Sequence, residues 1–175
     1  FSSLKKLTSV EIGSCEDIPQ NAFAYCEALK VITISKCANI GSNAFRSCKS
    51  VEELSIVECA DISSNAFLGM TALRSVKIDT CGKIGSSAFS SMMSSTGAEP
   101  CKALEDVVIG QCTEIGEFAF YQLKNLKNIS IGACQSVGRM AFTGVGNSEN
   151  PIETLALDGV NLGENVFGSA HINNL

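Results

Sequence analysis

Charge is scarce in this chain, and its scarcity excludes several kinds of partner. The 175 residues include 13 lysines and arginines against 18 aspartates and glutamates, which gives a net charge of -5. A protein that neutralises phosphates needs clustered Lys and Arg side chains, and the sequence has no such cluster. We therefore expect no nucleic-acid partner and no binding to an anionic membrane surface.

Long hydrophobic runs are also missing. No apolar stretch approaches the ~20 residues that a membrane-spanning helix needs, so we expect no membrane insertion. Hydrophobic residues still make up 45% of the chain, enough for one substantial core. This predicts a single domain over residues 1–175.

Catalytic and metal-binding motifs are lacking too. The sole histidine, His171, has no cysteine or serine motif nearby, and we interpret it as an exposed edge residue. There is no C-x-x-C, no zinc-type pair and no phosphate loop. The acidic pairs at 52–53 and 105–106 fit solvated strand edges better than an acid/base dyad. We predict no enzymatic activity, no cofactor and no metal.

What the sequence does contain is a repeat of 22 residues. The phrase IGSNAFRSC at 40–48 returns as ISSNAFLGM from Ile62 and as IGSSAFSSM from Ile84. An Ala-Phe pair marks each copy, at 22–23, 44–45, 66–67, 88–89, 119–120 and 141–142, with Val166-Phe167 as a variant. Insertions near 93–103 and 146–151 interrupt the spacing. We expect about seven repeats, truncated at both ends.

Each half of the unit predicts its own local structure. LRSVKIDTC at 73–81 alternates apolar and polar residues, the pattern of a short strand with one buried face. The Ser or Asn before Ala-Phe, as at Asn43 and Asn65, predicts a capped single helical turn or 3₁₀ turn. The glycine after the Ile column, as at Gly41 and Gly85, predicts a turn with positive φ.

A 22-residue unit cannot bury its apolar columns alone, but stacked copies can. We therefore predict an α/β solenoid, a right-handed coil with a parallel β-sheet on its concave face and short helical turns on its convex face. The phenylalanines should form one core ladder: Phe23, Phe45, Phe67, Phe89, Phe120, Phe142 and Phe167.

Nine cysteines fall mostly into two columns. The first column consists of Cys15, Cys37, Cys59, Cys81, Cys112 and Cys134, with Val160 in the last repeat. The second consists of Cys26 and Cys48 with Met70, Met92, Leu123 and Val145. Because apolar residues replace cysteine in both columns, we interpret them as buried ladders of reduced thiols. Cys101 stands alone in the first insertion and should react first.

The repeat resembles a known class. Its residues Ile40-Gly41, Ala44-Phe45, Cys48, Val51, Leu54 and Ile56 are similar to the BspA-like, or Treponema pallidum-type, leucine-rich repeat. The resemblance covers nearly the whole chain and implies a secreted or surface protein that adheres to a protein ligand, a host matrix or cell-surface protein. The C-x-x-I feature also resembles the cysteine-containing repeats of F-box adaptors. A cytoplasmic adaptor and a purely structural spacer therefore remain as alternatives.

The candidate binding face consists of outward strand positions that should stack into rows. The first row is Glu11, Thr33, Ser55, Lys77, Val108 and Ser130. The second row includes Ser35, Val57, Asp79 and Asp158. Concave solenoid faces commonly bind ligands, although these rows have none of the Trp, Tyr or Arg residues typical of binding hot spots.

The two insertions, SSTGAEPC at 94–101 and GNSENP at 146–151, should both lie between a turn and the next strand. Equal positions in the repeat would place both loops on one edge of the solenoid. This predicts a rim patch beside the binding face.

Overall fold

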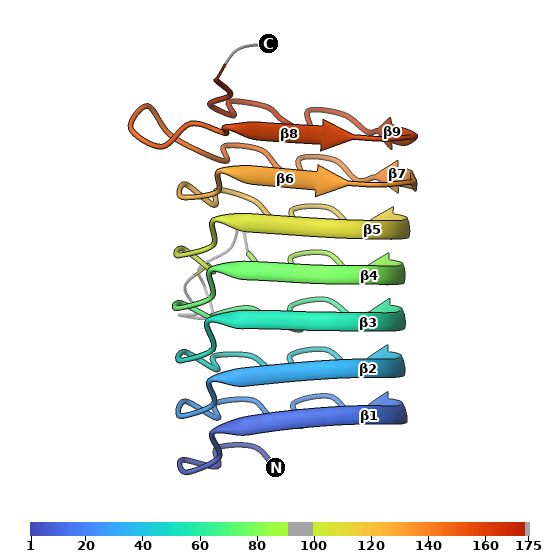
Figure 1. Ribbon diagram of the computed structural model, residues 1–175, viewed down its shortest axis with the longest axis vertical. Helices are drawn as coiled ribbons and strands as arrows, with labels where there is room; N and C mark the ends of the chain where they lie inside the picture. The colour runs from blue at the N-terminus through green and yellow to red at the C-terminus, as the bar shows by residue number, and fades with distance from the viewer. Residues whose placement is uncertain (91–99, 174–175) are drawn as a thin grey trace.

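The protein is a stack of seven coils whose strands form one parallel sheet (Figure 1). The structure is a computed structural model, and it describes residues 1–90 and 100–173. The strands are β1 (Ser9–Ile18), β2 (Val31–Ile40), β3 (Glu53–Ile62), β4 (Ser75–Ile84), β5 (Asp106–Ile115), β6 (Asn128–Ile131), β7 (Cys134–Val137), β8 (Thr154–Leu157) and β9 (Val160–Leu162). We number the coils 1 to 7 from the N-terminus; coil 6 contains β6 and β7, and coil 7 contains β8 and β9.

The strands are longer than the alternating sequence pattern predicts, because each of β1 to β5 continues through the cysteine to the next isoleucine. In β3, Leu54 and Ile56 point into the core, then Val57 and Glu58 both face outward. Two consecutive outward residues bend the strand, so we divide it into a first arm, up to Val57, and a second arm, from Glu58. In the second arm Cys59 returns to the core.

The register of the sheet confirms the predicted repeat columns. Ile34 pairs with Ile12 and Ile56, and Cys37 pairs with Cys15 and Cys59. Each column therefore forms a line of like side chains along the stack. A single core cluster results, which runs from the first coil to the last.

The phenylalanines form the predicted ladder behind the sheet. Consecutive rings from Phe1 to Phe167 stack nearly parallel, with centroids 4.8–5.7 Å apart. The rings of Phe45, Phe67, Phe89, Phe120 and Phe142 are fully buried. These five are the largest of the fully buried side chains.

The predicted helical turns are absent, since the described residues contain no helix. The chain behind the sheet instead makes β-turns, such as the one closed by Ala44 N–H donating to the Gly41 carbonyl at 3.0 Å. Asn43, third in that turn, has φ of 57°. Asparagine tolerates this left-handed conformation better than most residues, so the column predicted to cap a helix serves a positive-φ turn.

The glycine column has a different cause from the one predicted. Gly41 and Gly85 are not among the glycines with positive φ. A Cβ built on Gly85 would lie 2.6 Å from the backbone N of Ser64 in the preceding coil and 2.7 Å from the Ile62 carbonyl oxygen. Glycine is needed here because two backbones approach closely, a role that the sequence pattern does not distinguish from turn geometry.

Hydrogen bonds link the coils on both sides of the stack. On the sheet side Gly41 N–H donates to the Ile18 carbonyl of the preceding coil. On the turn side Phe45 N–H donates to the Ala66 carbonyl of the next coil, and Ser47 N–H donates to Leu68. The ring spacing behind the sheet is therefore close to the ~4.8 Å between strands, and the coils rise as a nearly straight column (Figure 1). The predicted concave face is accordingly almost flat.

Cys101 does not stand alone as predicted. Its N–H donates to the Phe89 carbonyl, just as Cys48 N–H donates to Phe45. Cys101 therefore occupies the second cysteine column in coil 4, the place assigned to Met92. Residues 91–99, which include Met92 and most of the first insertion, lie outside the described residues.

Candidate functional site

The outer face of the first arms holds the predicted candidate rows, and the strand register aligns the first of them. Glu11 pairs with Thr33, Thr33 with Ser55, and Ser55 with Lys77. Lys77 pairs in turn with Val108, and Val108 with Ser130. None of these side chains is buried. The geometry thus assembles a continuous row across the stack.

The second candidate row runs beside the first at the corner of the strands. Ser35, Val57 and Asp158 are exposed, and Asp79 is half-buried. An ion pair of 2.9 Å between Lys77 Nζ and Asp79 Oδ1 joins the two rows. Because both side chains are accessible to solvent, we expect this pair to contribute little to stability. The face is mixed in charge and carries small side chains.

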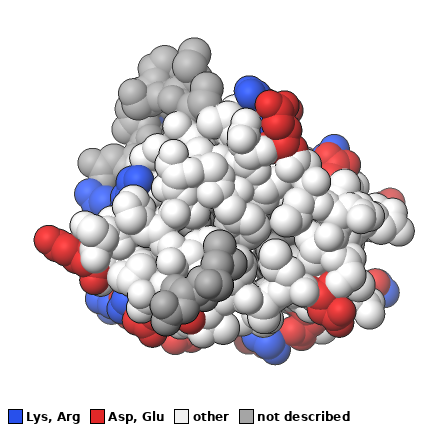
Figure 2. Space-filling model, turned by 90° about the horizontal axis from the view of Figure 1, so that it is seen from above, with Lys and Arg blue, Asp and Glu red and all other residues white. Residues whose placement is uncertain are grey.

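Charged side chains lie mainly around the circumference of the stack. Figure 2 looks onto the end that carries the C-terminus and shows Lys, Arg, Asp and Glu at the rim, with uncharged residues in the middle. Both signs of charge are interspersed along this rim. Within this view, basic and acidic side chains alternate around the rim rather than forming a patch of one sign.

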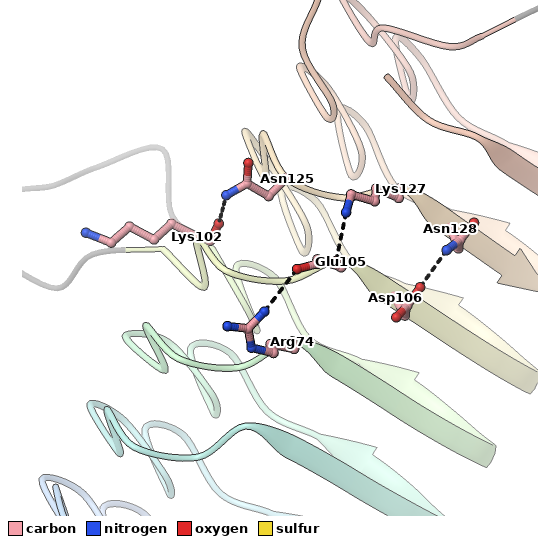
Figure 3. A network of polar contacts seen from close by, with 7 residues as sticks. All are labelled: Arg74, Lys102, Glu105, Asp106, Asn125, Lys127 and Asn128. Carbon is pink, nitrogen blue, oxygen red and sulfur yellow. Dashed lines mark hydrogen bonds and ion pairs between the residues drawn. The ribbon is translucent and has the colours of Figure 1, made fainter. Parts of the chain in front are cut away.

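A column of alternating charge, which the sequence analysis missed, lies where each turn leads into its strand. Its members are Lys30, Glu52, Arg74, Glu105, Lys127 and Glu153. Glu105 binds both neighbours, with 3.2 Å to Arg74 Nη1 and 2.9 Å to Lys127 Nζ (Figure 3). The hydrogen bond from Lys127 is the main cause that lowers the pKa of Glu105. The signal was in the sequence: charge changes sign at this position from repeat to repeat.

The adjacent carboxylates Glu105 and Asp106 have separate partners. Asp106 Oδ1 accepts a hydrogen bond of 2.7 Å from Asn128 Nδ2, while Glu105 binds the two cations (Figure 3). Each carboxylate is thus held toward its own neighbours along the stack. This arrangement supports the interpretation of the pair as strand-edge residues.

The first cysteine column lies within the core, as predicted. All nine cysteines of the chain are free in the structure, and only Cys15 is more than slightly exposed. The Cys15 Sγ atom donates to the Cys37 Sγ atom at 3.2 Å, so these two neighbouring thiols are in contact. Among residues 1–90 and 100–173, no group of three or more His, Cys, Asp or Glu could hold a metal ion.

An aromatic cluster on the turn side was not predicted. The rings of Phe118 and Tyr121 meet edge to face with centroids 5.6 Å apart, and the Arg139 guanidinium lies 5.6 Å from the Phe118 ring centroid. Phe118 has φ of 57°, at the position where most coils have Asn or Ser. The sequence does show a bulky residue in this column. It does not show that the backbone at this column is left-handed, so the cluster could not be predicted.

The insertions do not enter the repeat at the same point. The first lies between Phe89 and Cys101, inside the turn, whereas the second lies between Val145 and Ile152, after it. In the second, Asn147 Oδ1 accepts hydrogen bonds from the N–H groups of Glu149 and Asn150. The prediction that both insertions enter the repeat at the same point, on which the rim patch was based, is therefore wrong.

The side chain of His171 is exposed, as expected.

These features define a class of protein: a parallel-stranded solenoid whose coils repeat every 22 residues. The family model of the BspA type leucine-rich repeat region matches residues 1–96 and 94–175, in six copies. The chain belongs to this family. Comparison with the curated proteins and with the solved structures gave no match. Among the described residues, no helix is long and apolar enough to cross a bilayer.

Proposed function

We propose that this chain is a non-enzymatic module that binds a protein ligand through the flat outer face of its strands. The observation that carries the proposal is the unbroken alignment of the first row, from Glu11 to Ser130, with no buried member. Leucine-rich repeats generally mediate protein–protein interactions, and stacked repeats provide extended surfaces for this.

The family supports a more specific form of the proposal. Proteins with BspA type repeats are commonly associated with the cell surface, so we propose a secreted or surface-displayed protein. Its ligand would be a host matrix or cell-surface protein, and its role adhesion. The first row carries one acidic and one basic residue, Glu11 and Lys77, and this balance favours a protein ligand over a polyanion.

The nine free thiols favour a second candidate, a cytoplasmic adaptor that recruits another protein. Thiols persist mainly in reducing compartments, whereas secreted proteins commonly oxidise them. Both candidates use the same face. They differ in ligand and in location, so the location of the full-length protein in its own cells separates them.

The binding proposal is tested with the whole chain and a panel of purified matrix proteins in surface plasmon resonance. Ser55→Arg and Ser130→Arg place bulk and charge in the first row and should weaken any observed binding at least tenfold. Ser86→Arg, at an exposed position on the turn side, is the matched control and should leave binding unchanged. Equal affinities for all three variants would exclude the first row as the binding face.

A further inference from the structure

Two thiols of the first cysteine column lie close enough to form a bond between coils. The Cys15 Sγ atom donates to the Cys37 Sγ atom at 3.2 Å, and the strand register places the two residues directly opposite each other in β1 and β2. Neighbouring parallel strands lie ~4.8 Å apart, within the range of about 4.4–6.8 Å that separates the Cα atoms of a disulfide. The two backbones therefore need little movement to bring these sulfur atoms together.

Accessibility distinguishes this pair from the rest of the column. Cys15 is partly exposed, because β1 pairs with β2 alone among the described strands. Cys59 faces Cys81, and Cys112 faces Cys134, in the same register, but these four residues are only 1–6% exposed. A dissolved oxidant can therefore reach Cys15 in the folded chain, but not the buried pairs.

The hydrogen bonds of the pair leave the sulfur of Cys37 facing its neighbour. The Cys37 Sγ atom donates to the Asn39 carbonyl at 3.0 Å, so its proton points along its own strand. The same sulfur accepts the proton of Cys15. Burial raises the pKa of Cys37 to about 12, which keeps this thiol protonated near neutral pH. Cys15, the accessible member, is thus the thiol that meets an oxidant first.

We propose that Cys15 and Cys37 are a redox-sensitive pair, which a small disulfide such as glutathione disulfide converts into a covalent bond between coils 1 and 2. The Cys15 thiolate attacks one sulfur of glutathione disulfide, forms a mixed disulfide and releases one glutathione. The Cys37 thiolate then attacks Cys15 Sγ and expels the second glutathione. The two cysteine protons end on the two glutathione thiolates, so two thiols are oxidised and one glutathione disulfide is reduced.

The second step is favoured because the attacking sulfur already lies beside its target. Reactions between oriented groups of one molecule reach effective concentrations far above those of dissolved thiols. This proximity offsets the small fraction of Cys37 that is ionised. A cysteine with no neighbour within reach would instead keep the bound glutathione.

The bond would hold the edge strand of the sheet in place. β1 pairs on one side only, and Phe1 and Leu4, which precede it, are exposed. Such an edge opens more readily than the middle of a stack. A cross-link between residues 22 positions apart restricts the unfolded chain more than the folded one, so coil 1 should open less often when the pair is oxidised. This inference does not depend on the proposed binding function.

The test uses the whole folded chain, first reduced and then kept in buffers with graded ratios of glutathione to glutathione disulfide. After free thiols are alkylated, mass mapping of proteolytic peptides should find a cross-link between Cys15 and Cys37. The buried pairs Cys59–Cys81 and Cys112–Cys134 should remain reduced. Hydrogen exchange of the β1 amides should slow at least tenfold on oxidation and recover on reduction.

Single substitutions separate the two steps. Cys37→Val removes the partner but keeps an apolar side chain, as Val160 does in coil 7, and should accumulate glutathione on Cys15. Cys59→Val is the matched control in the same column and should form the bond between Cys15 and Cys37 as the unmodified chain does. If Cys37→Val does not fold, Cys15→Ser gives a second test, because it should neither take up glutathione nor form a disulfide.

Three results would overturn the pair. They are a lasting glutathione adduct on Cys15 beside a free Cys37 in the unmodified chain, equally fast disulfides in the buried pairs, and unchanged thiols at the highest ratio of glutathione disulfide. A bond between Cys15 and Cys37 without slower exchange in β1 would support the redox pair but refute its effect on the edge strand.

Discussion

The Sγ atom of Cys101 donates a hydrogen bond to the carbonyl oxygen of Phe67 over 3.3 Å. Cys48 makes the same contact with Phe23, at 3.2 Å. The contact persists although nine extra residues separate Cys101 from the start of its coil. The chain returns to the same column after the insertion, and the thiol becomes part of the core.

This placement reverses the expectation for thiol reactivity. Cys101 is fully buried and should not react in the folded protein, whereas Cys15 is partly exposed and should react first. Titration with a thiol reagent should modify about one group before denaturation and all nine after it. Mass mapping identifies the site, and early labelling of Cys101 would contradict its position in the second column.

The buried thiols should make the protein sensitive to alkali. Burial raises the pKa of Cys48 and Cys101 to about 12, from an ordinary value of 9.0. The unfolded chain releases these protons at a lower pH than the folded chain, so the free energy of unfolding should fall as pH rises from about 9 to 12. Denaturant melts at several pH values measure the slope. Cys48→Val combined with Cys101→Val should make the slope shallower, since Val145 already occupies this column and Cys37 and Cys112, whose pKa values are also raised, remain. An unchanged slope would assign the whole effect to other groups.

The phenylalanines of the ladder should contribute unequally to the free energy of unfolding. Phe67 is fully buried between two rings, so Phe67→Ala should cost ~3–5 kcal/mol of unfolding free energy. Phe1 is 83% exposed and stacks on one ring only, so Phe1→Ala should cost much less. Urea melts compare the two variants. Equal losses would mean that the rings do not act as a buried column.

Adding a single methyl group to a glycine of the column after the isoleucines should lower the stability of the protein. Gly85→Ala brings a Cβ within 2.7 Å of the preceding backbone and should cost ~1–3 kcal/mol. Gly13→Ala meets nothing within 4 Å and should change stability by less than ~0.5 kcal/mol. Ser63 occupies the equivalent position in coil 3, which favours the lower end of the range for Gly85. Thermal melts of the pair test whether close approach explains the column.

The turn position with positive φ, occupied by Asn43 in coil 2, should favour asparagine in every coil. Met140 has φ of 56°, an unfavourable conformation for its side chain, so Met140→Asn should stabilise the protein by about 1 kcal/mol. Asn43→Met makes the reverse change at φ of 57° and should destabilise it by a similar amount. If both variants lose stability, packing of these side chains outweighs the backbone conformation.

Much of the fold could be predicted because stacking converts a repeated column into a line of contacts. The phenylalanine and first cysteine columns needed only their spacing to be interpreted as core. The second arm escaped prediction because Cys59 and Ile62 are three residues apart, which obscures the two-residue period of a strand. The turns were misassigned because Asn suits both a helix cap and a positive-φ turn.

The site was harder to predict than the fold. The first row follows from strand alternation, so its members could be named correctly as outward residues. The column around Glu105 could have been found by comparing charge at one repeat position, but alternation along the stack has no counterpart in the local sequence.

The two sets of hydrogen bonds, one on each side of the coils, determine how the molecule grows with length. A repeat backed by wide helices bends into an arc, and its ends curve toward each other as copies are added. Here every 22-residue unit adds about 4.8 Å in one direction, so seven coils span about 29 Å between the first and last strands. In a longer array of such units, the number of repeats would set the distance between a bound partner and the point where the array is attached.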